Sequence, residues 1–349
     1  MKQMPDREFY NIRSILGNDW AMFYFLLGAR EAGKSYAVTD FFCNQFVKYG
    51  RPFYWLRLSD LSAKKLLQNN ADKLIDPDLK RKYHLDLITN GSNVYRVLQR
   101  DKKTSKITKK VLMARVFSLA TFYNDKGSGI YDKDFLLDPN MYYNIALDEM
   151  NREESEKHTF DIVYNFVNQM ENLVRSTKQR LRVICIGNTL DEASDLLTAF
   201  NFIPVEFGRY YIRKKRAVID YMCPSKKYQE RRKGTISDLL TPDASTFSNK
   251  NESDASLVSG DRLRVPMYII QFYKNDKSKY TVWNDRIIAR YNGEKCKRKI
   301  AMRPYLDVKF IPDDRNSVVQ NFDDRMFLFH NLLTYKEFKK DLEYLKKNR

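Results

Sequence analysis

The sequence FLLGAREAGKSYA, residues 25–37, decides the fold: an apolar run leads into two glycines that bracket four residues, and Lys34 and Ser35 follow. Residues 28–35 match the pattern G-x-x-x-x-G-K-S, which is typical of a phosphate-binding loop between a strand and a helix. Glycines let the backbone curl so that its N–H groups point inward at phosphate oxygens, and the start of the helix adds partial positive charge. The alternative is a glycine-rich turn that carries a surface lysine.

This loop predicts a binding site for ATP and Mg²⁺. Lys34 is expected to reach the β- and γ-phosphates, and the hydroxyl of Ser35 is expected to bind Mg²⁺. The residues expected to surround the nucleotide are those of the loop and the first helical turn: Gly28, Ala29, Arg30, Glu31, Ala32, Gly33, Lys34, Ser35 and Tyr36.

A pair of acids follows another apolar run, in YYNIALDEMN, residues 142–151. A strand here would deliver Asp148 and Glu149 at its carboxyl end, where ligands bind in open α/β sheets. We expect Asp148 to hold Mg²⁺ together with Ser35, and Glu149 to orient and activate the attacking water. Taken alone, an acidic pair after a strand is also typical of a helix N-cap.

A third apolar run, RVICIGN, ends in Asn188. Adjacent Asp and Glu indicate the class of P-loop hydrolases with a catalytic glutamate, called ASCE, in which a further strand lies between the loop strand and the acidic strand. Residues 182–187 supply that strand, and Asn188 is expected to contact the γ-phosphate or the water. The alternative is an ordinary asparagine at a turn.

The first two hundred residues alternate short apolar runs with amphipathic segments, a pattern that predicts an α/β domain with a mostly parallel sheet. We expect helices at 34–49 and 158–175. Strands are expected at 23–27, 52–58, 142–147 and 182–186.

The chain has 349 residues and a formal charge of +18, which favours a polyanionic partner such as nucleic acid. Basic residues concentrate in 96–115, which reads as a hairpin, and in 205–234. A charge run is also often just a solvated face. Four scattered cysteines and three histidines form no metal-binding spacing, and the apolar runs are too short for a membrane helix, so we expect an intracellular protein.

The remainder of the chain changes in composition. A polar stretch at 241–259 indicates a loop or linker. After it come three runs typical of antiparallel strands and a last helix with Tyr335, Phe338, Leu342 and Leu345 on one face. We therefore expect a P-loop ATPase domain at 1–204, a basic linker region at 205–259 and a smaller α+β domain at 260–349.

With GAREAGKS, IALDEM and RVICIGN in this order, the sequence resembles the genome-packaging ATPases of small podophages, the Picovirinae type, which are relatives of large terminases and of the FtsK/HerA translocases. The resemblance covers the N-terminal domain best. It implies a homomeric ring, most often a pentamer, that docks on the portal of a procapsid in the host cytoplasm and drives double-stranded DNA through its pore. A structural RNA is a further candidate partner.

The resemblance also implies residues that act in trans between neighbouring subunits. The arginine finger falls best on Arg175, with Arg180 as the fallback, and a second basic residue falls on Lys126. An arginine supplied in trans can raise the hydrolysis rate by about 10³–10⁵. The C-terminal domain resembles a ribonuclease-H-type nuclease that has lost its catalytic acids, which implies docking on capsid or nucleic acid and no cleavage.

A translocating motor must grip any DNA sequence, so its contacts are expected to go to phosphates and to weaken with salt. The candidate contacts are lysines after the second strand and on the hairpin: Lys64, Lys65, Lys102, Lys103, Lys106, Lys109 and Lys110.

Two other functions fit the motifs and remain open at this point. One is a helicase or conjugation-type DNA-dependent ATPase, which a strand-separation assay would identify. The other is a nucleotide-gated DNA-binding scaffold that rarely turns over, which steady-state phosphate release would exclude.

Overall fold

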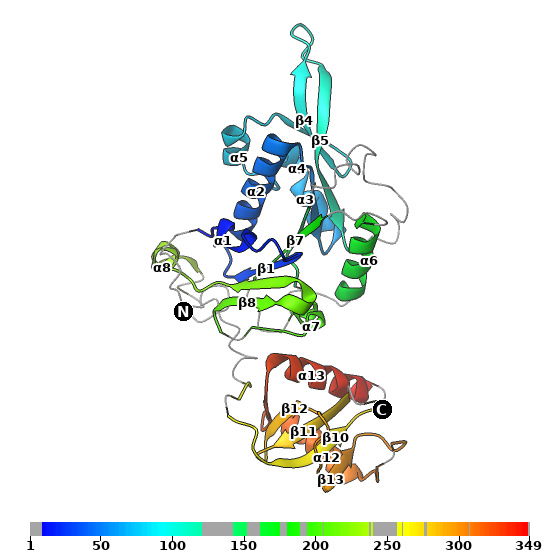
Figure 1. Ribbon diagram of the computed structural model, residues 1–349. Coiled ribbons are helices and arrows are strands. Elements are labelled where there is room, and N and C mark those ends of the chain that lie inside the picture. Colours follow the sequence, from blue (N-terminus) through cyan, green and yellow to red (C-terminus); the bar gives the residue numbers. More distant parts are fainter. Residues whose placement is uncertain are drawn as a thin grey trace. The chain divides into compact units, whose positions relative to one another are not determined.

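The computed structural model divides the chain into two compact units (Figure 1). The first unit comprises Met1–Leu190 and Glu206–Lys250, and the second comprises Asp191–Val205 and Asn251–Arg349. The structure describes residues 9–120, 142–151, 161–174, 180–188, 194–204, 206–236, 239, 257–259, 261–275, 278–306 and 308–347.

A large sheet forms the centre of the first unit, with nine strands among the described residues in the order β3-β4-β5-β2-β6-β7-β1-β9-β8. The six central strands, β5-β2-β6-β7-β1-β9 in sheet order, pair in parallel. The outer pairs β3–β4, β4–β5 and β8–β9 are antiparallel. The strands are β1 (Phe23–Gly28), β2 (Phe53–Arg57), β3 (Leu87–Asn90), β4 (Asn93–Arg100), β5 (Ile107–Ser118), β6 (Tyr142–Asp148), β7 (Arg180–Asn188), β8 (Gly208–Ile212) and β9 (Ala217–Tyr221).

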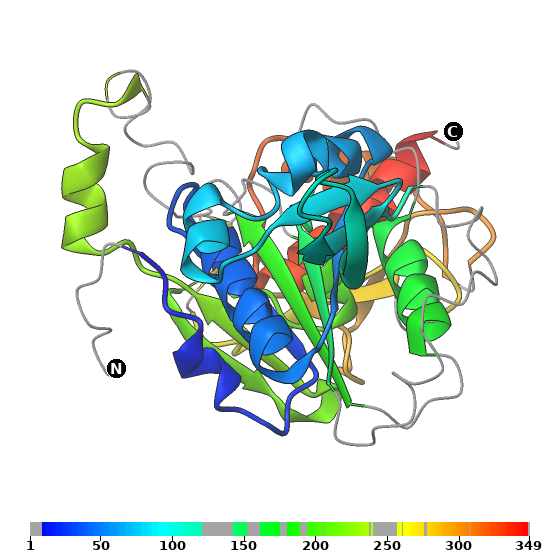
Figure 2. The same ribbon diagram turned by 90° about the horizontal axis from the view of Figure 1, so that it is seen from above.

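Helices cover both faces of this sheet (Figures 1 and 2). On one face α2 packs Val38, Phe42 and Phe46 into the core, and on the other Phe166 of α6 contacts Phe23 of β1. The helices of this unit are α1 (Arg13–Leu16), α2 (Lys34–Tyr49), α3 (Asp60–Leu66), α4 (Gln68–Ala71), α5 (Pro77–Lys82), α6 (Ile162–Val174) and α8 (Lys226–Arg232), with a 3₁₀ turn, η3, at Arg213–Lys215.

The α/β class expected from the sequence is confirmed, because β7 lies between β6 and β1 and pairs with both in parallel. Central strands that are buried on both faces read as continuous apolar runs, which is why their positions were visible in the sequence. The basic stretch 205–259, expected as a linker, instead begins with two strands of the large sheet. Its basic residues concentrate in η3 and in α8, whereas β9 is buried along its whole length.

The second unit has its own sheet and core. The sheet order is β13-β10-β11-β12-β14, in which β10, β11 and β12 are antiparallel, β13 is parallel to β10, and β14 is parallel to β12. The predicted apolar face of the last helix is buried in this core. The elements are α7 (Asp195–Ala199), β10 (Pro266–Gln271), β11 (Lys279–Trp283), β12 (Ile287–Arg290), β13 (Arg298–Ala301), α12 (Pro312–Asp323), β14 (Leu328–Phe329) and α13 (Leu332–Lys347).

One hairpin, β4–β5, extends away from the body of the first unit (Figure 1). Its base is buried through Val94 and Met113, whereas residues 98–106 are mostly exposed. Asp101 closes the turn, because its carboxylate accepts hydrogen bonds from the backbone N–H groups of Lys103 and Thr104.

Among the described residues, no helix is both long and apolar enough to cross a bilayer.

Candidate active site

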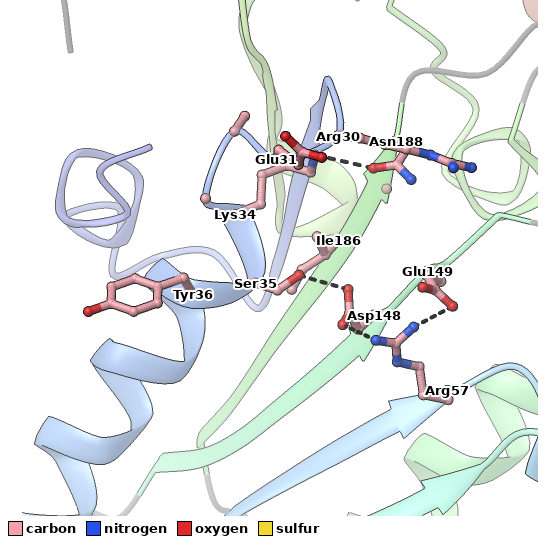
Figure 3. Close-up of a pocket in the computed structure, with 13 residues that line it drawn as sticks. Arg30, Glu31, Lys34, Ser35, Tyr36, Arg57, Asp148, Glu149, Ile186 and Asn188 are labelled. Carbon is pink, nitrogen blue, oxygen red and sulfur yellow. Dashed lines mark hydrogen bonds and ion pairs between the residues drawn. The ribbon is translucent and has the colours of Figure 1, made fainter. Parts of the chain in front are cut away.

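Most of the residues expected to bind and hydrolyse ATP meet in one cavity of about 360 Å³ (Figure 3), whereas Gly28 and Ala29 of the loop do not line it. Strand β1 leads into the loop 28–35, and the neighbouring strands β2, β6 and β7 end in Arg57, Asp148 and Asn188. The carboxyl ends of neighbouring parallel strands meet at one edge of the sheet, which brings these side chains together. Residues 30–36 line the cavity with them.

The loop itself depends on glycine. Gly33 has φ 81°, and a Cβ atom at this position would lie 3.2 Å from side-chain atoms of Phe9. Only glycine adopts such a conformation without steric cost and leaves this space. Glu31 also has a positive φ, 62°, which is uncommon for a residue with a side chain and marks a position that its surroundings hold in place.

Lys34 begins α2 and is buried, with 5% of its surface exposed. Its ammonium donates to the carbonyls of Gly28 and Ala29, at 2.8 and 2.5 Å, and to the Asn188 side-chain oxygen at 3.3 Å. Burial lowers the pKa of Lys34 to about 8, with Asp148 opposing and Arg30 adding to this effect. An anion in the cavity would therefore stabilise the charged form of Lys34.

Ser35 and Asp148 lie face to face, and the Ser35 hydroxyl donates to Asp148 Oδ1 at 3.1 Å (Figure 3). Burial raises the pKa of Asp148, the nearby charge of Arg57 lowers it, and Glu149 raises it further. These two side chains offer oxygen atoms of the kind that Mg²⁺ prefers, and Mg²⁺ sites commonly use one carboxylate together with phosphate oxygens and waters. Among the described residues no group of three or more His, Cys, Asp or Glu could form an all-protein site. The donor set therefore fits Mg²⁺ bound jointly with a nucleotide.

Glu149 follows the last residue of β6 and has φ 58°. The chain turns here, because the N–H of Met150 is bonded to the carbonyl of Ile186 on β7. Left-handed backbone at a residue with a side chain costs of order 1–3 kcal/mol and clusters at functional sites. Glu149 lines the cavity, and 56% of its side chain is exposed to solvent.

Arg57 was not singled out by the sequence, although it makes ion pairs with both acids (Figure 3). One nitrogen of its guanidinium lies 2.9 Å from Asp148 Oδ2, and the other contacts Glu149. The feature of the sequence that could have indicated Arg57 is its place as a charged residue at the end of the apolar run FYWLR, residues 53–57. Its partners depend on β2 lying next to β6 in the sheet, which no local pattern predicts.

Other predicted residues lie elsewhere. Lys126 and Arg175 are outside the described residues, and Arg180 is the first residue of β7. Lys64 and Lys65 are exposed in the last turn of α3, the helix that follows β2. The remaining lysine candidates are all exposed on the hairpin β4–β5: Lys102, Lys103, Lys106, Lys109 and Lys110.

The hairpin lysines form no ion pair with any residue that the structure describes, and Lys110 lies over the Tyr95 ring at 4.4 Å from its centroid. Asp101, the acid at the tip, is occupied by the turn, since hydrogen bonds from the backbone of Thr104, its hydroxyl and the backbone of Lys103 lower its pKa. Asp101 therefore stays ionised, and it is the one acid among the five lysines of residues 98–110, so the tip keeps a net positive charge.

Comparison with known proteins relates the chain to phage packaging proteins. Residues 4–98 match the family described as Podovirus DNA encapsidation protein (Gp16). Over 198 residues the chain is 27% identical to the DNA packaging proteins of Bacillus phages phi29 and PZA, covering 56% of this chain and 51% of each relative. The chain thus spans about half the length of the curated relatives it matches.

Two solved structures share the fold over most of the chain. The bacteriophage phi29 viral genome packaging motor assembly has a TM-score of 0.62 at 19% identity, covering 97% of this chain and 99% of that one. The Phi-28 gp11 DNA packaging motor has a TM-score of 0.54 at 13% identity, covering 97% and 98%. Together with the family match, these likenesses confirm the resemblance to podophage packaging proteins that the sequence motifs indicated.

Proposed function

We propose that this homologue of the podovirus DNA packaging proteins is an ATPase that drives double-stranded DNA into a viral procapsid. The observation that supports this function best is the convergence of Lys34, Ser35, Asp148 and Glu149 on one cavity. A phosphate loop alone binds nucleotide, whereas a loop joined to a metal-binding acid and a second, exposed acid is equipped to hydrolyse it.

The cavity residues divide the work on ATP between them. Lys34 would exchange its carbonyl partners for β- and γ-phosphate oxygens. Ser35 and Asp148 would hold Mg²⁺, which neutralises phosphate charge as the γ-phosphoryl group leaves. Asn188, which already bonds Lys34, lies where it could also contact the γ-phosphate.

Glu149 is the candidate for orienting and activating water. It is exposed in the cavity, unlike the buried Asp148, so a water molecule can reach its carboxylate. Arg57 pairs with both acids before nucleotide binds, and its charge opposes the effect of burial on the pKa of Asp148. Arg57 must give up part of this pairing when Mg²⁺ binds Asp148 and Glu149 turns toward water.

A ring of subunits would complete the site. The Glu149 side chain is 56% exposed at the cavity, so a basic residue of a neighbouring subunit could approach it. We assign this role to Arg175, with Arg180 as the alternative, and a second such role to Lys126. Ring assembly would then control hydrolysis, and a pentamer is the proposed number.

For DNA we propose phosphate contacts by the exposed lysines of α3 and of the hairpin β4–β5. The hairpin lysines outnumber Asp101, the acid in their turn, and form no ion pair with a described residue, so a phosphate backbone would neutralise their excess charge. Such contacts position the duplex without reading its sequence.

The second unit is assigned to docking on the portal, on capsid or on a structural RNA, in the cytoplasm of the infected host. Two of its acids stabilise the fold: Asp341 accepts a hydrogen bond from Tyr280 at 2.8 Å, and Glu337 pairs with Arg290. The described residues hold no acidic cluster that could bind metal for cleavage.

The experiment is ATPase activity of the purified chain with and without double-stranded DNA, for the wild type and Glu149→Gln. General-base catalysis contributes about 10²–10⁴-fold, so the turnover of Glu149→Gln should fall by that order while ATP binding persists. Glu171→Gln, an exposed acid on α6, is the matched control and should behave as the wild type. Full turnover in Glu149→Gln would refute the catalytic assignment, and strand separation by the wild type would indicate a helicase.

A further inference from the structure

Helix α8 contacts the phosphate loop, although more than 190 residues of sequence separate them. The Tyr228 hydroxyl donates to the carbonyl of Arg30 at 2.9 Å, and Arg231 donates to the carbonyl of Glu31 at 2.7 Å. From the N-terminal segment, the N–H of Tyr10 donates to the carbonyl of Ala32, also at 2.9 Å. Three consecutive carbonyls of the loop are therefore held from outside the cavity.

These bonds determine where the loop N–H groups point. In a planar trans peptide the carbonyl and the N–H of the next residue face opposite ways. With the carbonyls of residues 30, 31 and 32 held by α8 and Tyr10, the N–H groups of residues 31, 32 and 33 point away from those partners. Successive N–H groups directed to one side form an anion-binding nest. The N–H groups of residues 31, 32 and 33 would then form such a nest before any phosphate arrives.

The loop also contains an acid, which is unfavourable next to phosphates. Glu31 lines the cavity, and 61% of its side chain is exposed. Its carboxylate is held by Arg232, whose guanidinium is 6% exposed and lies 2.6 Å from Glu31 Oε2. Without Arg232 only the longer contact with Arg231, at 4.0 Å, would remain, and the carboxylate could turn toward the nucleotide and repel its phosphates.

We propose that α8 is a brace of the phosphate loop, and that Arg232 is a positioning residue for ATP that holds Glu31 away from the phosphates. Tyr228 and Arg231 fix the two peptide groups on either side of Glu31, and Arg232 neutralises its charge. The proposal rests on the proposed function, because it concerns nucleotide binding by the same loop.

The test measures binding of a fluorescent ATP analogue with Mg²⁺, together with KM and kcat for ATP. Charge-assisted hydrogen bonds are among the strong ones, so Arg232→Gln should raise Kd and KM about tenfold, with a much smaller change in kcat. Lys226→Gln, an exposed residue at the start of the same helix, is the control and should bind as the wild type.

The double variant Glu31→Gln with Arg232→Gln separates positioning from mere support of the helix. If the freed carboxylate causes the defect, removing its charge should restore most of the affinity lost in Arg232→Gln. If Arg232 only stabilises α8, the double variant will bind no better than Arg232→Gln, and the proposal is wrong.

Tyr228→Phe keeps the ring and removes the hydroxyl that bonds Arg30, so it tests the brace even where a variant of Arg232 fails to fold. We expect its Kd to rise about threefold, the effect of one lost hydrogen bond. If both Tyr228→Phe and Arg232→Gln bind nucleotide with wild-type affinity, the role of α8 as a brace is wrong and the proposed function still stands. A wild-type chain that binds no nucleotide would overturn the proposed function with it.

Discussion

At the scale of single residues, the Lys34 ammonium is buried among neutral oxygens. Its hydrogen bonds go to two carbonyls and one amide, and its pKa is lowered from 10.5 to about 8. Between these two values the unfolded chain binds a proton that the folded chain lacks, so stability of the nucleotide-free protein rises with pH across this window. Bound phosphates should reverse the shift by stabilising the charge.

The first prediction is proton uptake on nucleotide binding. At pH 8.5 a part of the free protein has neutral Lys34, and phosphate binding should recharge it, so ATP affinity should fall as pH rises through 8. Titration calorimetry in buffers of different ionisation enthalpy measures the uptake directly. Lys34→Met should lose both the linked uptake and most of the affinity. Equal binding at pH 7 and pH 9 by the wild type would contradict the prediction.

A second prediction concerns Arg57. Arg57→Gln removes the partner of both acids. The pKa of Asp148, which burial already raises, should then rise further, and Asp148 should bind Mg²⁺ less tightly. We expect kcat to fall about 10–100-fold and the Mg²⁺ concentration for half-maximal activity to rise, since removal of one electrostatic partner has effects of this order. Arg51→Gln, before the other end of β2, should leave the Mg²⁺ dependence unchanged.

At the scale of elements, the helices and strands that the sequence predicted best are those with a strict local pattern. The helix 34–49 matches α2 at both ends, where Gly33 and Gly50 take left-handed conformations. The strands β8 and β9 were missed, because the basic residues of η3 between them concealed the buried run of β9. Local charge density indicates exposure of a turn, and it does not determine whether the flanking residues join a sheet.

The same distinction applies to the site. Lys34, Ser35, Asp148 and Glu149 could be found because each is tied to a short motif. Arg57 and Arg232 could not, since their partners come from strand order and from a helix distant in sequence. Contacts that depend on the packing of separate elements have no period or spacing in the sequence.

The third prediction belongs to the hairpin β4–β5. Replacing Lys102, Lys103 and Lys106 by Gln should weaken binding of double-stranded DNA and reduce the salt dependence of log Kd by up to about 3 units of slope, roughly one for each lost phosphate contact. A set of three exposed lysines in the second unit, Lys295, Lys297 and Lys299, offers a control with the same change in charge. An equal loss in both variants would show that net charge alone matters and that the hairpin has no special role.

At the scale of the whole chain, the two units have separate hydrophobic cores. The first core contains Phe42 and Trp55, and the second centres on Phe338, which is fully buried among aromatic rings. Nucleotide binds only in the first unit under the proposed function. A ligand that binds the folded state alone stabilises it in proportion to the logarithm of its excess over Kd.

The final prediction therefore separates the units by calorimetry. Mg²⁺-ATP added to Glu149→Gln, which should bind without hydrolysis, is expected to raise only the unfolding transition of the first unit, by about 2.7 kcal/mol at a hundredfold excess over Kd. Phe338→Ala should lower only the other transition, because removing a buried phenylalanine ring costs about 3–5 kcal/mol. Nucleotide affinity should be the same with and without Phe338→Ala, since the cavity lies wholly in the first unit. A single transition that responds to both changes would show that the two cores unfold together, and hydrolysis could then be coupled to the second unit through stability itself.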